Sequence, residues 1–401
     1  MSAAEAPHPE DYNPFDPAHV DDHFATLAAL RESVRVHQPM PGVHYVPRYD
    51  DIVEVCRRFE EFGQGGFEPL EADSRPPELI QLGESDPPEH TKVRRILAAA
   101  LSPPRMRAYE PIVNEICGEI VDRFADQGQA DLIEDLGAPL PAQVIGRLAG
   151  IPVGMRGRLR PYSDDLIGAR ALPDPDEARR CQQRVNNFDQ ELRAVIADRQ
   201  QSGERPDDLM TQLIEYRDDN GQPLHDEKIL ATLSKDIVVG GIETTTHLIG
   251  NLFYLLLSEP GLYERVRADR SLVPLAVEET LRHHNPVQVL FRRARTDVDL
   301  FGTPVAAGEV VCLGYSAANR DPRAFDDPEA FRLDRPDPRR HLGFGWGIHL
   351  CVGAPLARLE ATAGLNAVLD RIAHMELAPG TDYQRVLFFM MRGPTRMDVV
   401  F

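Results

Sequence analysis

Residues 344–353 read Phe-Gly-Trp-Gly-Ile-His-Leu-Cys-Val-Gly, and this is the strongest signal in the sequence. Glycines crowded before Cys351 predict a tight loop whose backbone closely approaches another group. A helical pattern follows at once, from Ala354 through Ile372. Cys351 is therefore expected at a helix N-terminus, where the dipole and the free N–H groups stabilise a thiolate. The alternative is a buried cysteine beside a glycine turn, since a lone cysteine is usually buried.

The composition is that of a globular protein with a substantial core. The chain has 401 residues, a formal net charge of −20, 42% hydrophobic residues and 27% charged residues. A chain this acidic repels phosphate groups and anionic lipid, so we expect neither nucleic acid nor a membrane as a partner. The sequence contains no run of about 18 apolar residues, so we predict no membrane span.

Two features predict a protein of the reducing cytoplasm. Residues 1–17 lack a basic start followed by an apolar stretch, so no signal peptide is predicted. The cysteine count is odd and no two cysteines have C-x-x-C spacing, which argues against a disulfide framework or a structural zinc site. The cysteines are Cys56, Cys117, Cys181, Cys312 and Cys351.

Helical periodicity dominates the chain, and strand patterns are short. The longest candidate helix, Asp226–Ser258, has an apolar centre and should run through a core. We predict a mainly α fold with small β-sheets, in a single domain over residues 1–401 that includes an extended N-terminal segment at 1–20. Gly63–Pro88 is predicted to be a long loop. The other predicted helices are Asp50–Phe62, Glu89–Leu101, Arg105–Gln127, Pro141–Leu148 and Glu177–Gln201. The predicted strands are His44–Val46, Val298–Leu300, Val305, Val310–Leu313 and a terminal hairpin of Val386–Met391 with Met397–Phe401.

The cysteine stretch resembles the haem-binding loop of the cytochrome P450 family, F-x-x-G-x-x-x-C-x-G. Phe344, Gly347, Cys351 and Gly353 fill its defined positions. The resemblance runs from about Asp86 to the C-terminus. It implies a triangular, mainly helical fold with a long central helix over one haem b, whose iron is held by Cys351. It also implies a monooxygenase that inserts one oxygen atom of O₂ into a hydrophobic small molecule.

A second family motif is Glu279-Thr280-Leu281-Arg282, an E-x-x-R on a predicted helix. Side chains at i and i+3 share a helix face and can form an ion pair. Alone the motif is weak, because such pairs are common on protein surfaces. In the family it forms a buried triad with a later arginine, and Arg335 occupies that position. We interpret the three residues as structural.

A third motif lies in the long helix, at Gly240-Gly241-Ile242-Glu243-Thr244-Thr245. Two glycines cost a helix interior roughly 1 kcal/mol each, which calls for an explanation. In the family this helix opens over the haem where O₂ binds. The resemblance makes Glu243 and Thr244 the acid–alcohol pair that delivers protons. The alternative is a kink without a catalytic role.

Haem carries two carboxylates that need cations or hydrogen-bond donors. His90 and Arg94 have i, i+4 spacing on one predicted helix face. The resemblance adds His349 and Arg292, with the adjacent Arg293 as an alternative to Arg292. It also implies that Gly241, Phe344, Gly345 and Gly353 contact the cofactor.

The substrate pocket follows from the resemblance by position. Its predicted lining is the loop 67–82 together with Val239, Gly240, Val287, Gln288, Leu290, Phe388 and Phe389. Most of these side chains are apolar, which favours a hydrophobic substrate. Gln288 is a polar exception that either orients the substrate or faces solvent.

Monooxygenation needs two electrons, and the sequence has no flavin-binding or iron–sulfur motif that could supply them. We therefore expect a separate redox partner, a ferredoxin with its reductase. We expect a basic docking patch around the cysteine loop for this partner. Its predicted members are Arg320, Arg323, Arg332, Arg335, Arg339, Arg340 and Arg358, with Lys92, Arg95 and Arg105.

Two other functions stay open. One is a peroxygenase that uses H₂O₂ directly; such family members typically carry Arg-Pro in place of Glu243-Thr244. The other is a haem-thiolate sensor or binding protein without turnover, for which a proton-delivery pair has no evident use.

Overall fold

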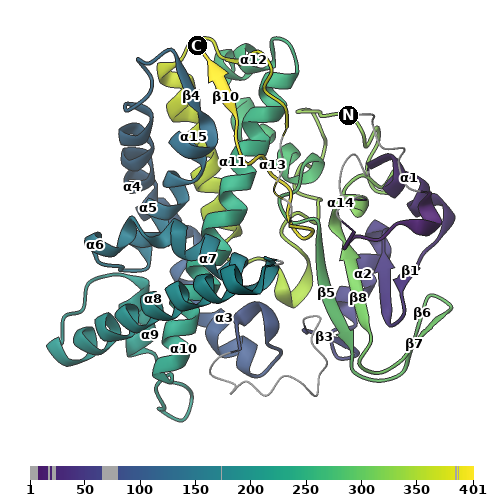
Figure 1. The fold of residues 1–401 in the computed structure, drawn as a ribbon, viewed down its shortest axis with the longest axis horizontal. Helices are drawn as coiled ribbons and strands as arrows, with labels where there is room; N and C mark the ends of the chain where they lie inside the picture. Colours follow the sequence, from purple (N-terminus) through teal and green to yellow (C-terminus); the bar gives the residue numbers. More distant parts are fainter. Residues whose placement is uncertain are drawn as a thin grey trace. The chain divides into compact units, whose positions relative to one another are not determined.

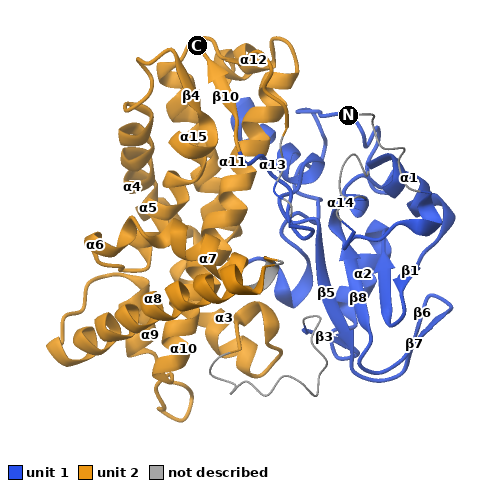
Figure 2. Ribbon diagram, viewed as in Figure 1, with its two compact units in different colours: residues 1–74, 271–351, 384–395 blue, residues 75–270, 352–383, 396–401 orange. Residues whose placement is uncertain are grey.

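The computed structural model describes residues 8–16, 19, 24–65, 80–172, 174–383, 386 and 388–401. These residues are mostly helical and also form a five-stranded, a three-stranded and a two-stranded sheet (Figure 1). The chain divides into two compact units (Figure 2). Unit 1 comprises residues 1–74, 271–351 and 384–395, and unit 2 comprises residues 75–270, 352–383 and 396–401. A single domain with an extended segment at 1–20 stays a prediction.

Unit 1 is built around the five-stranded sheet, whose strand order is β1-β2-β8-β5-β3. β2 pairs in parallel with β8, and β5 pairs with β8 in antiparallel register, so that Cys312 lies opposite both Tyr45 and Phe291. The sheet strands are β1 (His37–Met40), β2 (Val43–Val46), β3 (Phe62–Gly63), β5 (Val289–Ala294) and β8 (Val310–Gly314). The two-stranded sheet is β6 (Val298–Leu300) with β7 (Thr303–Val305). The helices are α1 (Phe24–Ser33), α2 (Tyr49–Arg57), α13 (Val273–His283) and α14 (Tyr315–Ala318).

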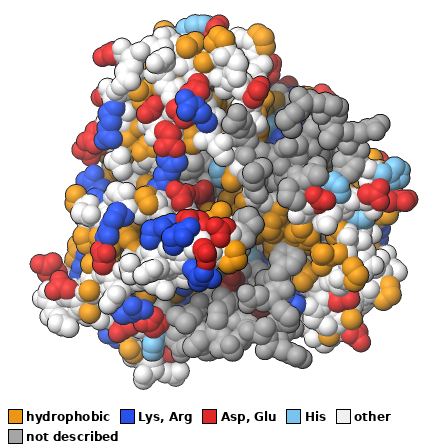
Figure 3. Space-filling model, in the orientation of Figure 1, with side chains coloured by type: hydrophobic (Ala, Val, Ile, Leu, Met, Phe, Trp, Pro, Cys, Tyr) orange, Lys and Arg blue, Asp and Glu red, His pale blue; other side chains and the backbone are white. Residues whose placement is uncertain are grey.

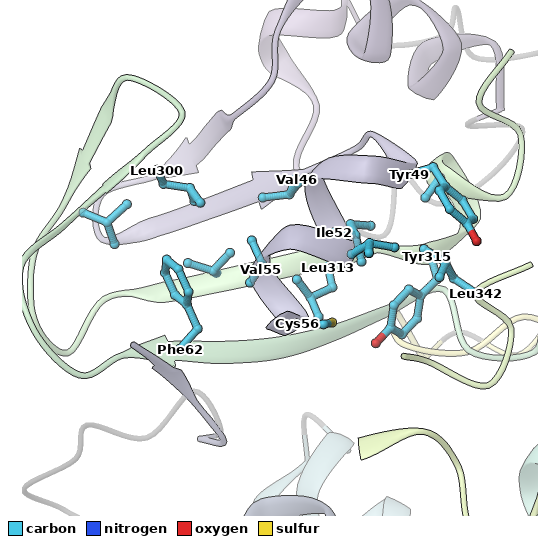
Figure 4. Close-up of a cluster of buried hydrophobic side chains, with 14 of the residues drawn as sticks. Val46, Tyr49, Ile52, Val55, Cys56, Phe62, Leu300, Leu313, Tyr315 and Leu342 are labelled. Atoms are coloured by element: carbon cyan, nitrogen blue, oxygen red, sulfur yellow. The ribbon is translucent and has the colours of Figure 1, made fainter. Parts of the chain in front are cut away.

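The two faces of this sheet bury different clusters, because successive side chains of a strand point to opposite faces. From β5, Leu290 and Ala294 pack into the cluster that holds α2, whereas Val289 and Phe291 pack into the other. Figure 4 shows the first cluster, with side chains of α2 lying over those of β8 and β3. Alternation therefore puts Arg292 on the α2 face.

Unit 2 is a helical body with the small sheet β4-β10-β9. Within it α4 packs on α15, and α7 packs on α8. The helices are α3 (Glu89–Ala100), α4 (Pro103–Val121), α5 (Pro139–Leu148), α6 (Val153–Arg156), α7 (Leu159–Ala171), α8 (Pro175–Ser202), α9 (Leu209–Glu215), α10 (Asp226–Ala231), α11 (Gly240–Ser258), α12 (Leu262–Ala268) and α15 (Ala354–Arg371). The strands are β4 (Gln129–Asp131), β9 (Glu376–Leu377) and β10 (Asp398–Val400).

The long helix predicted at Asp226–Ser258 is confirmed in extent, but it is not uniform. Between α10 and α11 the segment Thr232–Val239 is π-helical. A π-helix bonds i to i+5 and is locally wider, and it is frequent at functional sites. The irregularity thus ends at Val239, directly before Gly240, where the sequence predicted an opening.

The other predicted helices are confirmed with shifted ends, but the terminal hairpin is wrong. β10 pairs with β4 and β9, so that Val399 lies opposite both Ala130 and Leu377. A turn signal such as Gly393-Pro394 indicates a reversal without naming the strand's partner, and here the buried Val399 joins a sheet of distant segments. Most of the predicted loop Gly63–Pro88 lies outside the described residues, as do most positions of the loop 67–82 that was expected to line the pocket.

Charged side chains of both signs are interspersed over unit 2 (Figure 3). Some form ion pairs between helices, such as Arg184–Asp165 and Arg193–Glu227. Within the described part of the chain, every helix is too short or too polar to cross a membrane.

Candidate functional site

The loop before α15 is closed by its own backbone. The Cys351 N–H donates to the Phe344 carbonyl oxygen at 2.8 Å, and Gly345 N–H donates to Leu342 O at 2.9 Å. Gly345 and Gly347 have φ values of 74° and 72°, in the left-handed region that favours glycine. The crowded glycines therefore serve the loop's conformation, as the sequence predicts.

Cys351 differs from the other cysteines in exposure. Cys56, Cys117, Cys181 and Cys312 are buried, whereas Cys351 is exposed, and all five are thiols. Cys351 stands three residues before α15, and Gly353 caps that helix. The alternative of a buried structural cysteine does not fit this exposure. The sequence neighbourhood of a helix start is one that stabilises a thiolate.

Trp346 has a packing role that the sequence left open. It packs against the α2-side cluster of unit 1. The guanidinium carbon of Arg57, from the last turn of α2, lies 5.2 Å from the centre of its ring. A cation over an indole face is attracted by the ring's quadrupole. Trp346 thereby ties the cysteine loop to α2.

Arg292 and Arg293 have different surroundings in unit 1. Arg292 is 4% exposed, donates to Gln64 Oε1 at 3.3 Å and to Phe291 O at 2.7 Å, and hydrogen-bonds the Cys56 thiol and the Tyr315 hydroxyl.

Both of these last partners adjoin the cysteine loop. A Cβ on Gly347 would lie 3.5 Å from Cys56 O, and one on Gly345 would lie 3.5 Å from the Tyr315 hydroxyl. Arg293 instead donates to Gly308 O. Of the two arginines, Arg292 is therefore the one on the loop's side of the sheet. Among the described residues no carboxylate pairs with Arg292.

The E-x-x-R residues form a closed triad with Arg335. Arg282 binds Glu279 through two hydrogen bonds of 2.7 and 2.9 Å, and Arg335 Nε lies 2.9 Å from both Glu279 oxygens. The three side chains are 1–6% exposed. Both guanidinium groups also donate to the carbonyl oxygen of Ala330. The triad thus joins α13 to residues 326–335.

A neighbouring group in unit 1 was missed by sequence reasoning. His341 Nε2 lies 2.9 Å from Glu278 Oε2, and His341 Nδ1 accepts from Gly343 N–H at 3.0 Å. Glu278 also pairs with Arg339 at 3.3 Å. This contact fixes the chain directly before the cysteine loop. The only sequence signal is that Glu278 precedes the motif residue Glu279.

In unit 2, the two glycines of α11 have different environments. A Cβ on Gly241 would lie 2.7 Å from Ile145 Cδ1, whereas one on Gly240 would meet nothing within 4 Å. Gly241 thus allows close packing of α11 on α5, and Gly240 leaves open space. The Thr244 hydroxyl donates to Gly240 O at 2.7 Å.

Glu243 lies in an acidic group that the sequence did not reveal. Its side chain is 13% exposed and hydrogen-bonds Asp164 of α7. Arg160, one turn before Asp164, donates twice to Glu134 at 2.6 Å and lies 4.0 Å from Asp164. Burial, and next the charge of Asp164, raise the pKa of Glu243 to about 7. His247 Nε2 lies 3.5 Å from Glu243.

The remaining predicted anchors are found on short local elements. His90 is 2% exposed on α3, with Arg94 half-buried one turn later on the same face. His349 belongs to a 3₁₀ turn at Gly347–His349 and is half-buried.

The predicted pocket residues of unit 1 divide into packing and lining positions. Gln288 does not face solvent: it is 6% exposed, and its amide donates to Phe389 O and Met391 O at 3.3 and 3.2 Å. Phe389 stacks edge-on against Phe15 with 5.0 Å between ring centres. The contacts of Gln288 and Phe389 therefore stabilise the turn at residues 388–391, near the C-terminus. Val287, Leu290 and Phe388 are partly buried, as is Val239 in unit 2.

The expected basic patch is wrong at two of its members and stays a prediction at the others. Arg320 and Arg335 have side chains only 6% exposed, so they present no charge to a partner. Arg323 pairs with Glu32, and Arg332 with Asp334, at 2.9 and 3.1 Å. In unit 2, Lys92, Arg95 and Arg105 pair with Glu89, Asp219 and Asp207. The sequence shows clustered arginines but not the acids that neutralise them.

Comparison with known proteins identifies relatives along most of the chain. The family model for cytochrome P450 matches residues 169–396. The cytochrome P450 monooxygenase PikC of Streptomyces venezuelae is 38% identical over 371 residues, covering 90% of this chain and 86% of that protein. The structure of CYP109Q5 from Chondromyces apiculatus matches with a TM-score of 0.85 and 30% identity over 98% of both chains. CYP109E1 from Bacillus megaterium, in complex with corticosterone, matches with a TM-score of 0.83 and 30% identity, covering 94% of this chain and 98% of that one. The mainly helical fold with small sheets is confirmed.

Proposed function

This chain belongs to the cytochrome P450 family, and we propose that it hydroxylates a hydrophobic small molecule with O₂ and electrons from a ferredoxin and its reductase. The enzyme is a P450 monooxygenase, and its family uses a haem iron and O₂. The observation that carries the proposal is the exposed Cys351 thiol at the end of a loop closed by the Cys351–Phe344 hydrogen bond.

The cofactor that we propose is haem b, bound through the Cys351 thiolate. The residues of unit 1 fit such a group: an exposed thiol, and a buried cation, Arg292, with no carboxylate partner among the described residues. Burying a cation costs free energy unless an anion or acceptors compensate it, and a haem carboxylate would do so. When bound, haem supplies the redox-active iron that activates O₂, and a thiolate ligand donates electron density to it. The further proposed contacts are His90, Arg94, Gly241, Phe344, Gly345, His349 and Gly353.

We propose Glu243 and Thr244 as the proton-delivery pair. The Thr244 hydroxyl proton is engaged by Gly240 O, so the oxygen of this hydroxyl is left to accept a hydrogen bond. With its pKa raised to about 7, Glu243 is a carboxyl that can both hold and release a proton near neutral pH. Gly240 leaves space on the same helix.

The proposed substrate is apolar. In unit 1 the proposed contacts are Val287, Leu290 and Phe388, and in unit 2 they are Val239 and Gly240. Steroids are the first class to test, because a structural relative, CYP109E1, is described in complex with corticosterone. Gln288 hydrogen-bonds the turn at residues 388–391, and Phe389 of that turn packs on Phe15. We therefore assign substrate recognition to their neighbours.

The test is turnover of the holoenzyme with a surrogate ferredoxin, its reductase, NADPH and ¹⁸O₂, using steroids first selected by their spin-state shift. We expect one ¹⁸O atom in each product molecule. Product formation from H₂O₂ at equal or higher rate, without the electron donors, would establish the peroxygenase instead. Haem binding and electron uptake without any substrate oxidation across steroids, terpenoids and aromatics would favour a sensor.

A further inference from the structure

Two charged side chains of unit 2 hold residues 80–82 against the segment between α10 and α11. Asp236 Oδ1, in the π-helical part of that segment, accepts from Leu82 N–H at 2.8 Å. Lys228 of α10 is 7% exposed and donates to Ile80 O. These contacts fix the orientation of the Asp236 carboxyl group, because one of its oxygens is bound to the backbone.

The second oxygen of this carboxyl group is in a different situation. Asp236 Oδ2 is buried, and within the described part of the chain no donor forms a hydrogen bond with it. A buried acceptor without a donor costs free energy relative to the same group in water. Oδ2 is therefore an acceptor for which the described residues supply no donor.

The position of Asp236 connects this acceptor with the proposed substrate contacts of unit 2. Gly240 follows four residues later, which is close to one turn both in an α-helix and in the wider π-helical turn, so the two residues share a face. Gly240 is exposed, and a Cβ there would meet nothing within 4 Å. Leu82, the other neighbour of Asp236, ends the loop 67–82 that is predicted to line the pocket. Asp236 thus adjoins two stretches that are proposed to contact the substrate.

The charges around Asp236 favour a neutral donor over a cation. Burial raises the pKa of Asp236 to about 7, and the charge of Glu84 adds to the rise. The Leu82 hydrogen bond and the charges of Lys228 and Lys235 act in the opposite direction. When ionised, a carboxylate only accepts hydrogen bonds. Because Lys228 brings a buried positive charge to this place, a substrate ammonium group would add a second one, whereas a hydroxyl group donates without adding charge.

We propose that Asp236 is a substrate-recognising residue, whose Oδ2 accepts a hydrogen bond from a hydroxyl group of an otherwise apolar substrate. One such polar contact orients a ligand that is held mainly by apolar surface. A site of this kind disfavours analogues that lack the hydroxyl group, because its own acceptor is then left unpaired. The inference rests on the proposed function and narrows its substrate class to apolar alcohols.

The test is equilibrium binding to the ferric holoprotein, measured by calorimetry, which needs neither electrons nor turnover. The probes are androstanols with the hydroxyl group at either end of the ring system, each compared with the ketone at the same carbon and with androstane. Decalin, its alcohol and its ketone form a smaller set. At about pH 8.5, where Asp236 is ionised, we expect at least one alcohol to bind about tenfold or more tightly than its ketone and its hydrocarbon.

Asp236→Asn keeps the acceptor for Leu82 N–H and replaces Oδ2 by an amide donor. A ketone accepts from this donor, so the preference for the alcohol over its ketone should fall to within about twofold. Asp189→Asn is the matched control. Asp189 is half-buried on α8 and accepts from the Tyr162 hydroxyl at 2.8 Å, so this variant makes the same change away from Leu82. It should keep the wild-type preference.

Lowering the pH gives a second readout, which a purely structural role of Asp236 would not move. Once protonated, the wild-type carboxyl group itself donates to a ketone, so its preference for the alcohol should shrink between about pH 8.5 and pH 5.5. Asp236→Asn should show no such change.

Equal affinity of the wild type for alcohol, ketone and hydrocarbon in every set, or no binding of any alcohol, would overturn the proposal and assign Oδ2 to a water molecule. An unchanged preference in Asp236→Asn would overturn it as well, and tighter binding of the matching amine would overturn the choice of a hydroxyl group. Tight binding of the alcohols without any oxidised product, when O₂ and electron donors are present, would instead refute the proposed hydroxylation and leave the recognition by Asp236 standing.

Discussion

The Thr244 hydroxyl donates to the carbonyl oxygen of Gly240 across 2.7 Å, one helical turn away. The bond fixes the hydroxyl rotamer of the residue that follows Glu243. It also uses the hydroxyl proton, so that the oxygen is presented as an acceptor. Gly240 adds no side chain to the space beside this bond, since a Cβ there would meet nothing within 4 Å.

Thr244→Ala should uncouple electron transfer from hydroxylation. Without the hydroxyl, protons are delivered in an uncontrolled way, and we expect hydrogen peroxide to replace most of the product while NADPH consumption continues. Hydroxylation per NADPH should fall about tenfold or more. The measurement is product and peroxide per NADPH. Thr246→Val is the control, because Thr246 is buried two residues away and its hydroxyl has no hydrogen-bond partner within the described part of the chain. Equal coupling in Thr244→Ala and wild type would remove Thr244 from the proton route.

Glu279→Gln should destabilise unit 1. The change leaves two buried guanidinium groups, those of Arg282 and Arg335, without their carboxylate. We expect the free energy of unfolding to drop by about 3–5 kcal/mol in urea titrations, because an uncompensated buried charge is costly. Asp334→Asn, which breaks the exposed pair with Arg332, should leave stability nearly unchanged. Equal losses of unfolding free energy in the two variants would show that the buried triad stabilises the protein no more than an exposed ion pair does.

Asp236 should make stability depend on pH. Burial raises its pKa to about 7, and its Oδ1 accepts from Leu82 N–H at 2.8 Å. The unfolded chain loses this proton near pH 4, so between about pH 4 and pH 7 the folded state binds the extra proton. The stabilisation is therefore complete below pH 4 and is lost as the pH rises through 7.

Asp236→Asn keeps the acceptor for Leu82 and removes the titration. Relative to wild type, its unfolding free energy should rise on the order of 1–4 kcal/mol between pH 4 and pH 7 and then level off. Urea titrations at several pH values measure this difference. A difference that does not vary with pH would mean that folding does not raise the pKa of Asp236.

Arg292 should retain haem more strongly than its neighbour Arg293. Arg292 lies on the face of the sheet that packs against Cys56 of α2 and Tyr315 of α14, beside the cysteine loop, whereas Arg293 donates to Gly308 O. We expect Arg292→Ala to lose haem to apomyoglobin at least about tenfold faster than wild type, since a charge-assisted hydrogen bond is removed. Arg293→Ala serves as the matched comparison. Faster loss from Arg293→Ala than from Arg292→Ala would reverse the assignment.

The sequence predicted the features that depend on short stretches. The glycine loop before Cys351 and the extent of Asp226–Ser258 follow from local spacing, whereas the triad of Glu279 with Arg335 was expected only from the family resemblance. It could not predict Asp164 beside Glu243, because that contact arises when α7 packs on α11. Nor could it predict that Arg320 is buried against Glu329, or that β10 joins β4. In each case the missing information is the tertiary partner, which no local pattern contains.

The reduced, CO-bound difference spectrum of the purified protein reports whether Cys351 is a thiolate ligand of haem iron. We predict a Soret band strongly red-shifted from that of histidine-ligated haem, lost in Cys351→His and retained in Cys181→Ala, in which a buried cysteine of α8 is replaced. A folded wild-type protein that binds no haem, or whose band has the histidine-type position, would show that Cys351 is not the ligand of a haem iron.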